Sequence, residues 1–385
     1  MKDISIYFSP LNCSELSNNQ LLGGQIIKYT FGSFPQIKKG SVVVFDVPEY
    51  RGDVRKDQEN YGESYRSFLY DLNIGFNWNM PIVDLGTINP GESINDTYFA
   101  VSQVVGELVK IGAIPVIIGG SQDLTVAVYK GYERLEQMVN LCSIDSKLDL
   151  GNPDEELASN GFVSHLLLQR PCFLFNHANI GLQAPFVSAQ EMELFDKLYF
   201  DCCRLGEFSA DHRKAEPHLR NADILSLDLT AVKSSDLMNV AYDSPNGFLS
   251  EQLCQITKYA GISDKLTSFG VFNYYPEKQK GVTSSLVAQL IWYFLDGVAS
   301  RKGDFPIGSK KNYLKFTVHL DDFKDEITFY KSNKSDRWWM EVPYPPQKGV
   351  KYERHQLVPC DAIDYEKAMK NELPDLWWKT YQKLS

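Results

Sequence analysis

The sequence lacks features that are typical of nucleic-acid-binding, secreted and membrane proteins. Lysine and arginine number 39 against 49 aspartate and glutamate residues, which gives a net charge of −10. This balance argues against a nucleic acid or an anionic membrane surface as the main partner. The first residues lack a basic segment followed by an apolar one, so we expect no signal peptide. No stretch approaches the roughly 18 uninterrupted apolar residues of a membrane helix, so we expect no membrane insertion.

The cysteine pattern excludes a disulfide framework or a cysteine-rich zinc site. The chain has 7 cysteines, an odd number, and they are scattered with no Cys-x-x-Cys spacing. Such a pattern is typical of reduced thiols, which predicts a cytoplasmic protein. The chain also has no P-loop lysine and no GxGxxG. We therefore expect Gly119 and Gly120 to form a tight strand-to-helix turn rather than a phosphate site.

Alternating apolar segments predict the fold class. Residues 41–48 and 113–120 are apolar runs without polar alternation, which favours strands covered on both faces. Between them, residues 95–111 have apolar side chains at helical spacing, with Phe99, Val101 and Val104 in the expected stripe. This alternation predicts an α/β protein with a mainly parallel sheet and helices on both faces.

The same alternation continues toward residue 300, where the character of the chain changes. We expect further elements at residues 125–139, 140–144, 224–229 and 250–260, and a closing helix at residues 288–298. A polar break follows, and then an aromatic-rich region with strand-like runs at residues 313–320 and 326–330 and a helix at residues 364–372. We therefore predict an α/β domain over residues 1–300, of which 1–40 is an N-terminal segment. Residues 301–385 form an extension docked on it.

Three polar motifs come at or just after expected strands. They read GGSQD at residues 119–123, DSKLD at residues 145–149 and SLDLT at residues 226–230. Functional residues of parallel α/β sheets cluster at the carboxyl ends of the strands, so these motifs are expected to meet there.

In order and context the three motifs resemble the metal-binding signature of the ureohydrolases, the family of arginase, agmatinase and formiminoglutamase. That family has Gly-Gly-Asp-His-Ser, Asp-Ala-His-x-Asp and Ser-x-Asp-x-Asp at these places. The resemblance covers roughly residues 40–300 and implies a three-layer α/β/α arginase-like fold. A Gly-x-Gln element at residues 181–183 is similar to the formiminoglutamase branch. The six ligands of the family's two manganese ions would fall on Gln122, Asp145, Lys147, Asp149, Asp228 and Thr230.

Half of these implied ligands have the wrong chemistry. Gln122 stands in place of a histidine and Thr230 in place of a carboxylate. Lys147, in place of the second histidine, carries an ammonium group that cannot ligate a cation. Asn273 falls where the family has the glutamate that faces the substrate. We predict a site without a metal or other cofactor, in which Lys147 offsets the charges of the three aspartates. The alternative is a manganese or other divalent ion still bound by Asp145, Asp149 and Asp228.

The extension holds four of the six tryptophans, in two adjacent pairs. These are Trp338 with Trp339, preceded by Arg337, and Trp377 with Trp378. Neighbouring residues of a strand point to opposite faces, so one tryptophan of each pair is expected in a core. The other would be exposed or would contact a partner, and tryptophan beside arginine is typical of interface anchors.

The leading functional hypothesis is therefore a ureohydrolase-fold pseudoenzyme that acts by binding. Its partner would be another protein, a second copy of itself, or a small ligand in the old pocket. The alternative is an active hydrolase of a linear amidine C–N bond, with an atypical or single metal. A third hypothesis makes Lys147 a base or nucleophile, but the neighbouring aspartates would raise its pKa rather than lower it.

Overall fold

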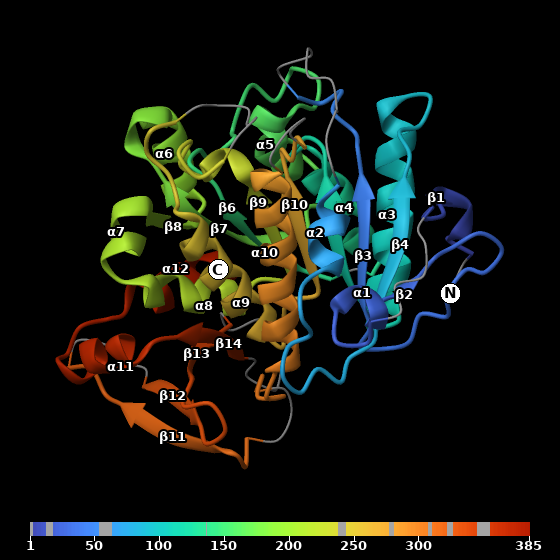
Figure 1. The fold of residues 1–385 in the computed structure, drawn as a ribbon. Coiled ribbons are helices and arrows are strands. Elements are labelled where there is room, and N and C mark those ends of the chain that lie inside the picture. The colour runs from blue at the N-terminus through green and yellow to red at the C-terminus, as the bar shows by residue number, and fades with distance from the viewer. Residues whose placement is uncertain are drawn as a thin grey trace.

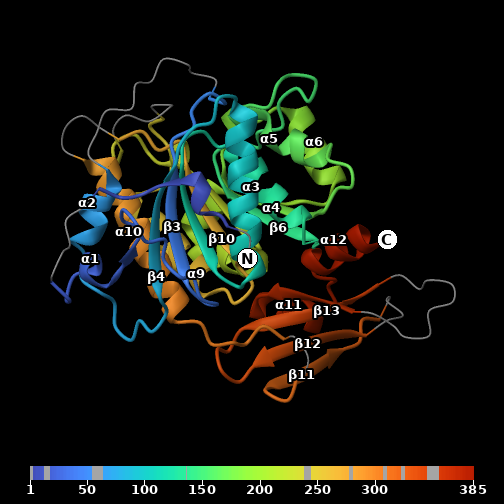
Figure 2. The same ribbon diagram turned by 90° about the vertical axis from the view of Figure 1, so that its right-hand side faces the viewer.

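The structure is a computed structural model that describes residues 3–12, 18–53, 64–135, 137–237, 244–276, 281–306, 310–321, 326–344 and 355–385. A large sheet is covered by helices on both faces, and a smaller sheet lies below it (Figure 1). Figure 2 shows α3, α4, α5 and α6 on one face of the large sheet and α1, α2, α9 and α10 on the other. The predicted three-layer α/β/α fold with a mainly parallel sheet is confirmed.

The elements have the following bounds. The large sheet contains β1 (Phe8–Ser9), β2 (Ile27–Lys28), β3 (Val42–Val47), β4 (Ile82–Ile88), β5 (Ile114–Gly119), β6 (Val139–Ile144), β7 (Leu174–Leu182), β8 (Asp201–Arg204), β9 (Ile224–Asp228) and β10 (Ser268–Phe272). The helices that accompany it are α1 (Leu22–Gln25), α2 (Tyr65–Tyr70), α3 (Ile94–Lys110), α4 (Leu124–Glu133), α5 (Phe162–Leu167), α6 (Ala189–Lys197), α7 (Leu205–Ala210), α8 (Glu216–Asn221), α9 (Ser250–Ile262) and α10 (Val282–Ala299). The small sheet contains β11 (Tyr313–Val318), β12 (Ile327–Ser332), β13 (Trp338–Pro343) and β14 (His355–Cys360), followed by α11 (Ala362–Met369) and α12 (Asp375–Leu384).

The order of strands brings distant motifs together. The sheet runs β1-β4-β3-β5-β10-β9-β6-β7-β8, with β2 pairing β4, and every pair except β1 with β4 is parallel. The central strands β5, β6, β9 and β10 are buried throughout, as expected from their continuous apolar runs. All four point the same way, so their carboxyl ends form one edge of the sheet.

Two sequence-based expectations about helices need correction. Phe99 does not belong to the buried stripe of α3: it is 55% exposed, and the Arg134 guanidinium lies 5.9 Å from its ring centre. The closing helix α10 begins at Val282, six residues before the expected start. By length and composition α10 could span a membrane, but 61% of this stretch is buried inside the structure. Such burial is typical of a core helix, and α10 packs on α9 and α2.

The extension forms a sheet of its own. The order is β11-β12-β13-β14, all antiparallel, and the expected strands at residues 313–320 and 326–330 are present as β11 and β12. Its apolar core includes Phe329, Met340 and Trp377 and is separate from the two cores of the large sheet. In Figure 1 the small sheet and α11, coloured orange to red, lie beneath the large sheet, and α12 is drawn higher, near α8.

The extension contacts the amino-terminal ends of the strands in the large sheet. Arg220, just before β9, donates to the carbonyl oxygens of Trp338 and Cys360, both at 2.8 Å. Asp201, the first residue of β8, pairs with Lys379 at 3.7 Å and Lys383 at 3.8 Å from α12. The motifs at the carboxyl ends lie at the opposite edge of the sheet from these contacts.

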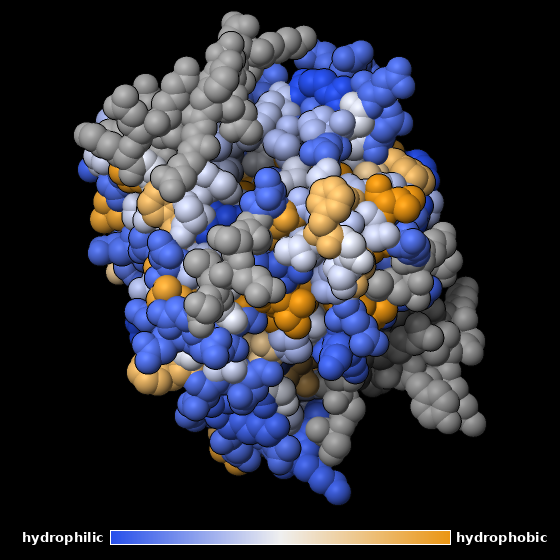
Figure 3. Space-filling model, turned by 45° about the vertical axis from the view of Figure 1, so that its right-hand side comes forward, coloured by the Kyte–Doolittle hydropathy of each residue, from blue (hydrophilic) through white to orange (hydrophobic). Residues whose placement is uncertain are grey.

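The surface seen in Figure 3 is largely hydrophilic. Apolar side chains on this face occur in small separate groups among polar ones. Isolated exposed apolar residues are normal on proteins, so the described residues on this face form no large contiguous apolar patch that would indicate a docking surface.

Candidate functional site

The motif residues gather at the carboxyl ends of four central strands. Gln122 follows β5, Asp145 follows β6, Asp228 ends β9 and Asn273 follows β10. These four side chains, with Asp149 and Thr230, are all at most 8% exposed, whereas Lys147 is half-buried. The tertiary structure therefore brings together residues that stand up to about 150 positions apart in the sequence.

Hydrogen-bond donors hold both oxygens of the Asp228 carboxylate. Asn273 Nδ2 donates to Oδ1 at 2.8 Å, and the Thr230 backbone N–H donates to the same oxygen at 2.7 Å. Thr230 Oγ1 donates to Oδ2 at 2.7 Å. Thr230, at the position of an implied ligand, and Asn273, at the position of the implied acid, thus both donate hydrogen bonds to Asp228.

Asp145, Lys147 and Asp149 form the second half of the cluster. Asp145 Oδ1 accepts the backbone N–H of Lys147 at 2.9 Å. Asp145 Oδ2 is buried and receives no N–H or O–H from the described residues. A proton on this oxygen would allow it to donate to Asp149, whose negative charge stabilises that proton. The two carboxyl groups are therefore placed to share a proton.

Burial raises the pKa values of all three aspartates. It raises the pKa of Asp149 to about 7, with a further increase from the charge of Asp228 and a decrease from Lys147. It raises the pKa of Asp228 to about 7, with a further increase from Asp145 and decreases from Asn273 and Thr230. The pKa of Asp145 lies well above its usual range because of burial and the charge of Asp149. Lys147 is thus only one of several groups that decide the charge of this cluster.

Backbone geometry at the site is unusual. Asp149 and Asn273 have φ angles of +48° and +55°, in the left-handed region that L-residues seldom adopt. The Asn273 N–H donates to the Gly120 carbonyl at 2.6 Å, which ties the end of β10 to the turn after β5. A side chain at Gly120 would place its Cβ 1.9 Å from the Glu49 carbonyl oxygen, so only glycine fits there. Such strained positions cluster at functional sites.

Two further residues contact the site although they are not among the seven positions implied by the resemblance. Ser226 on β9 bonds to Thr125 Oγ1 at 2.8 Å and accepts from Gln122 Nε2 at 3.4 Å. Asn179 on β7 donates to the Lys147 carbonyl at 2.6 Å. Both lie inside strands: Ser226 contacts the segment that follows β5, two strands away, and Asn179 contacts the motif that follows the neighbouring strand β6. Polar residues within apolar strand sequences were the available signal.

Among the described residues, no group of three or more histidine, cysteine, aspartate and glutamate side chains is arranged to hold a metal ion.

The tryptophan pairs of the extension divide as follows. Trp339 and Trp377 are buried, at 0% and 1% exposure. Trp378 is 46% exposed, and Trp338 is half-buried, stacked on Tyr365 with ring centres 5.1 Å apart. Trp377 and Trp378 lie on the helix α12 and not on a strand. Arg337 is half-buried and pairs with Glu216 at 3.3 Å.

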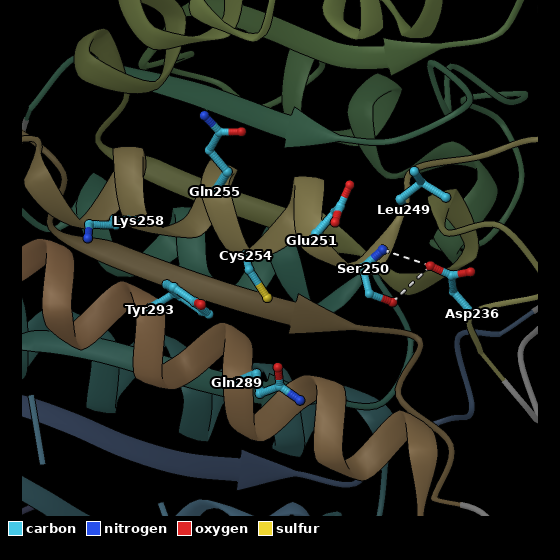
Figure 4. A pocket seen from close by; sticks show the side chains of 9 residues that line it. All are labelled: Asp236, Leu249, Ser250, Glu251, Cys254, Gln255, Lys258, Gln289 and Tyr293. Carbon is cyan, nitrogen blue, oxygen red and sulfur yellow. Dashed lines mark hydrogen bonds between the residues drawn. The ribbon is translucent and has the colours of Figure 1, made fainter. Parts of the chain in front are cut away.

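A groove also lies away from the candidate site, between two helices. This groove of about 650 Å³ runs between α9 and α10, and Cys254 and Tyr293 lie between the two helices (Figure 4). Two carboxylates, Asp236 and Glu251, line it, and Asp236 already accepts the backbone N–H and the hydroxyl of Ser250 at 2.9 and 3.1 Å. None of the motif residues lines this groove, so size alone does not locate the candidate site.

Comparison with known proteins identifies relatives of the large domain. A family model described as the arginase family matches residues 41–296. An uncharacterized 32.2 kDa protein in the hmfB 3' region of Methanothermus fervidus is 29% identical over 145 residues. That match covers 37% of this chain and 45% of the relative, so the chain spans less than half the length of that protein.

Solved structures with the same fold include proteins of the following three organisms. Formiminoglutamase of Trypanosoma cruzi with Mn²⁺ has a TM-score of 0.62 and 18% identity, covering 69% of this chain and 95% of that one. Formimidoylglutamase of Bacillus subtilis has a TM-score of 0.64 and 14% identity, covering 76% and 97%. Agmatine ureohydrolase of Thermoplasma volcanium has a TM-score of 0.56 and 19% identity, covering 69% and 90%. At these identities the likeness is one of fold.

Proposed function

This chain belongs to the arginase family, and we propose that it has lost the two-manganese centre and acts by binding rather than by catalysis. In the hydrolases that the motifs resemble, two manganese ions lower the pKa of a bridging water, so that hydroxide attacks a guanidinium-like carbon. The proposal therefore depends on whether the residues at the corresponding positions fit two such ions.

The hydrogen bonds of Asp228 carry the proposal. Asn273 and Thr230 fill its carboxylate oxygens with N–H and O–H donors, where ligands and a catalytic acid would be needed. Lys147 adds an ammonium group at a third position, and an ammonium has no lone pair for a metal. This donor set does not fit a two-manganese centre. It suits a polar pocket in which carboxyl groups are held by amide and hydroxyl donors, with the charge of an ammonium group nearby.

Metal content tests this proposal directly. Protein purified without chelator and then incubated with MnCl₂ should retain less than one manganese per chain, measured by plasma mass spectrometry. It should release neither urea nor formamide from arginine, agmatine or formiminoglutamate. Two tightly bound ions, or turnover that depends on manganese, would overturn the proposal.

A variant with restored ligands provides the matched control. Gln122→His, Lys147→His and Thr230→Asp combined should bind more manganese than the wild type, because the scaffold is that of the family. The variant should remain inactive, since Asn273 still replaces the acid. If it binds no more manganese than the wild type, the positions were assigned wrongly.

One observation favours a second candidate, a hydrolase with a single atypical metal. Asp145 Oδ2 is buried without a donor, and Asp149 and Asp228 act on the same group electrostatically. Carboxylates are suitable ligands for manganese or magnesium, but the three side chains would first have to move into a common ligand geometry, which the described residues do not have. One manganese per chain, lost on Asp145→Asn, would support this candidate over the first.

The binding hypothesis extends to partner and location. We propose that the exposed side of the extension, with Trp378 at its surface, contacts a partner protein or a second copy, and that the old pocket takes a small ligand. The extension lies at the opposite edge of the sheet from this pocket, so the two binding events would be separate. We also propose a cytoplasmic location, which is supported by the six free cysteines within the described residues.

A further inference from the structure

A second cavity lies beside the candidate site but does not share its side chains. It offers about 140 Å³ at the carboxyl ends of β3 and β5. Its lining includes one carboxylate and three tyrosines, Asp46, Tyr50, Tyr65 and Tyr274, together with Pro48 and Pro276. None of the seven positions implied by the resemblance lines it.

The charges around this cavity do not balance. Arg66 pairs with Asp46 through Nη1, and with Asp84 through Nε at 2.9 Å and Nη2 at 3.0 Å. In the part of the chain that the structure describes, Arg66 is the only cation paired with either carboxylate. Asp84 is fully buried, and Asp46 and Arg66 are mostly so. Two carboxylates therefore share one guanidinium, which leaves one negative charge in a poorly solvated place.

One tyrosine hydroxyl at the cavity has no hydrogen-bond partner within the described part of the chain. Tyr50 Oη donates to the Tyr274 carbonyl at 2.8 Å, and Tyr274 Oη bonds to Ser284 Oγ at 2.8 Å. Tyr65 is 1% exposed, and its hydroxyl has no hydrogen-bond partner among the residues that the structure describes. A buried hydroxyl without a partner is unfavourable, so a ligand that supplies a donor there would stabilise the protein.

We propose that this cavity binds a small organic cation, a primary ammonium or a guanidinium group. Such a cation would offset the charge of Asp46, lie among tyrosine rings that attract cations, and donate a hydrogen bond to Tyr65 Oη. The chemistry does not suit a divalent metal, which needs about six oxygen ligands, because the lining has one carboxylate and apolar prolines and rings. The volume fits a head group the size of methylammonium or guanidinium rather than a whole large metabolite.

Calorimetric titration of the full chain with methylammonium chloride, guanidinium chloride and potassium chloride at matched ionic strength tests the proposal. One of the two organic cations should bind with one site per chain, and potassium should not. Asp46→Asn should weaken this binding at least tenfold. Tyr65→Phe, which keeps the ring and removes only the unpartnered hydroxyl, should weaken it at least threefold and leave the melting temperature unchanged or higher.

Asp236→Asn is the control, because it neutralises a carboxylate in the groove between α9 and α10 and should leave the affinity unchanged. If Asp46→Asn does not fold, Tyr65→Phe still decides the question. Absence of binding by both organic cations, equal binding of potassium, or an unchanged affinity in Tyr65→Phe would overturn the proposal.

Discussion

Buried charged groups have different surroundings at the amino ends and at the carboxyl ends of the strands in the large sheet. At the amino ends, the Arg220 guanidinium donates to two carbonyl oxygens of the extension and pairs with Glu216 at 3.0 Å. It also lies 4.6 Å from the ring centre of Trp339. At the carboxyl ends, Asp145, Asp149 and Asp228 crowd together with mostly neutral donors. Burial raises the pKa of each of them.

This difference distinguishes charged groups that stabilise the fold from charged groups that belong to a candidate binding or reactive site. Fully paired charges fix the position of one element on another, as at the docked extension. Crowded carboxyl groups with raised pKa values destabilise the protein at neutral pH, and such arrangements are typical of sites that bind or react. The carboxyl-end cluster therefore retains the character of a ligand site even though half of the implied metal ligands are replaced.

The largest effect is expected at the paired end. Arg220→Met should lower the free energy of unfolding by about 3–5 kcal/mol, because Glu216 and two carbonyls lose their buried partner. Urea unfolding measures this loss, and limited proteolysis should show faster cleavage of the extension. Arg213→Met is the control, since Arg213 is 76% exposed and its ion pair within the described residues is with Asp211. Equal effects of the two changes would contradict the docking role of Arg220.

The neighbouring tryptophans of α12 should behave differently. Trp377→Ser should destabilise the fold by about 3–5 kcal/mol, because it empties a buried site and removes the bond from Nε1 to the Glu341 carbonyl at 3.0 Å. Trp378→Ser should leave the melting temperature nearly unchanged and reduce self-association or partner capture, measured by analytical ultracentrifugation and pull-down. If Trp378→Ser also unfolds the protein, the surface is part of the core and not an interface.

The free energy of unfolding should depend on pH in opposite ways for carboxyl groups at the two ends of the large sheet. A carboxyl group whose pKa is raised on folding binds more protons in the folded than in the unfolded state. Asp149 should therefore destabilise the protein progressively as pH rises from its usual pKa of 3.8 to about 7. Asp149→Asn should flatten this decline, measured as urea midpoints across this range.

Asp201 at the amino ends should act in the opposite sense. Burial alone would raise its pKa, but Lys383, His218, Lys379 and Asn176 lower it below the usual value. Its contribution is present above the usual pKa and is lost as the solution becomes acidic. Asp201→Asn should therefore reduce stability at neutral pH, whereas Asp149→Asn should increase it. The same sign for both changes would remove the contrast between the two ends.

The smallest effect is expected for Lys147, which is half-buried. Lys147→Met removes a positive charge that lowers the pKa of Asp149. The variant should lose more stability at pH 8 than at pH 5, where the carboxyl groups already carry protons. Lys130→Met, on the outer part of α4, is the control. A loss that does not depend on pH would show that Lys147 contributes packing and not charge.

The sequence by itself determined the strands and the place of the motifs. Runs such as residues 113–120 are apolar without alternation, and each motif follows such a run, so the parallel sheet and the meeting of the motifs at one edge could be predicted. The chemistry of the replaced positions could also be read directly, because an ammonium or an amide keeps its donors in any fold.

Only the tertiary structure decided which groups become partners. Asn273 holds Asp228 across 45 positions, Arg66 joins Asp46 to Asp84, and Arg220 reaches Cys360 across 140 positions. The exposure of Phe99, within an otherwise buried stripe, depends likewise on what packs against α3. The local pattern of apolar residues indicates which side of a helix or strand is buried. Hydrogen bonds and ion pairs, however, form between segments that are far apart in the sequence. Which of these segments become neighbours depends on the order of strands in the sheet, and a single sequence does not reveal that order.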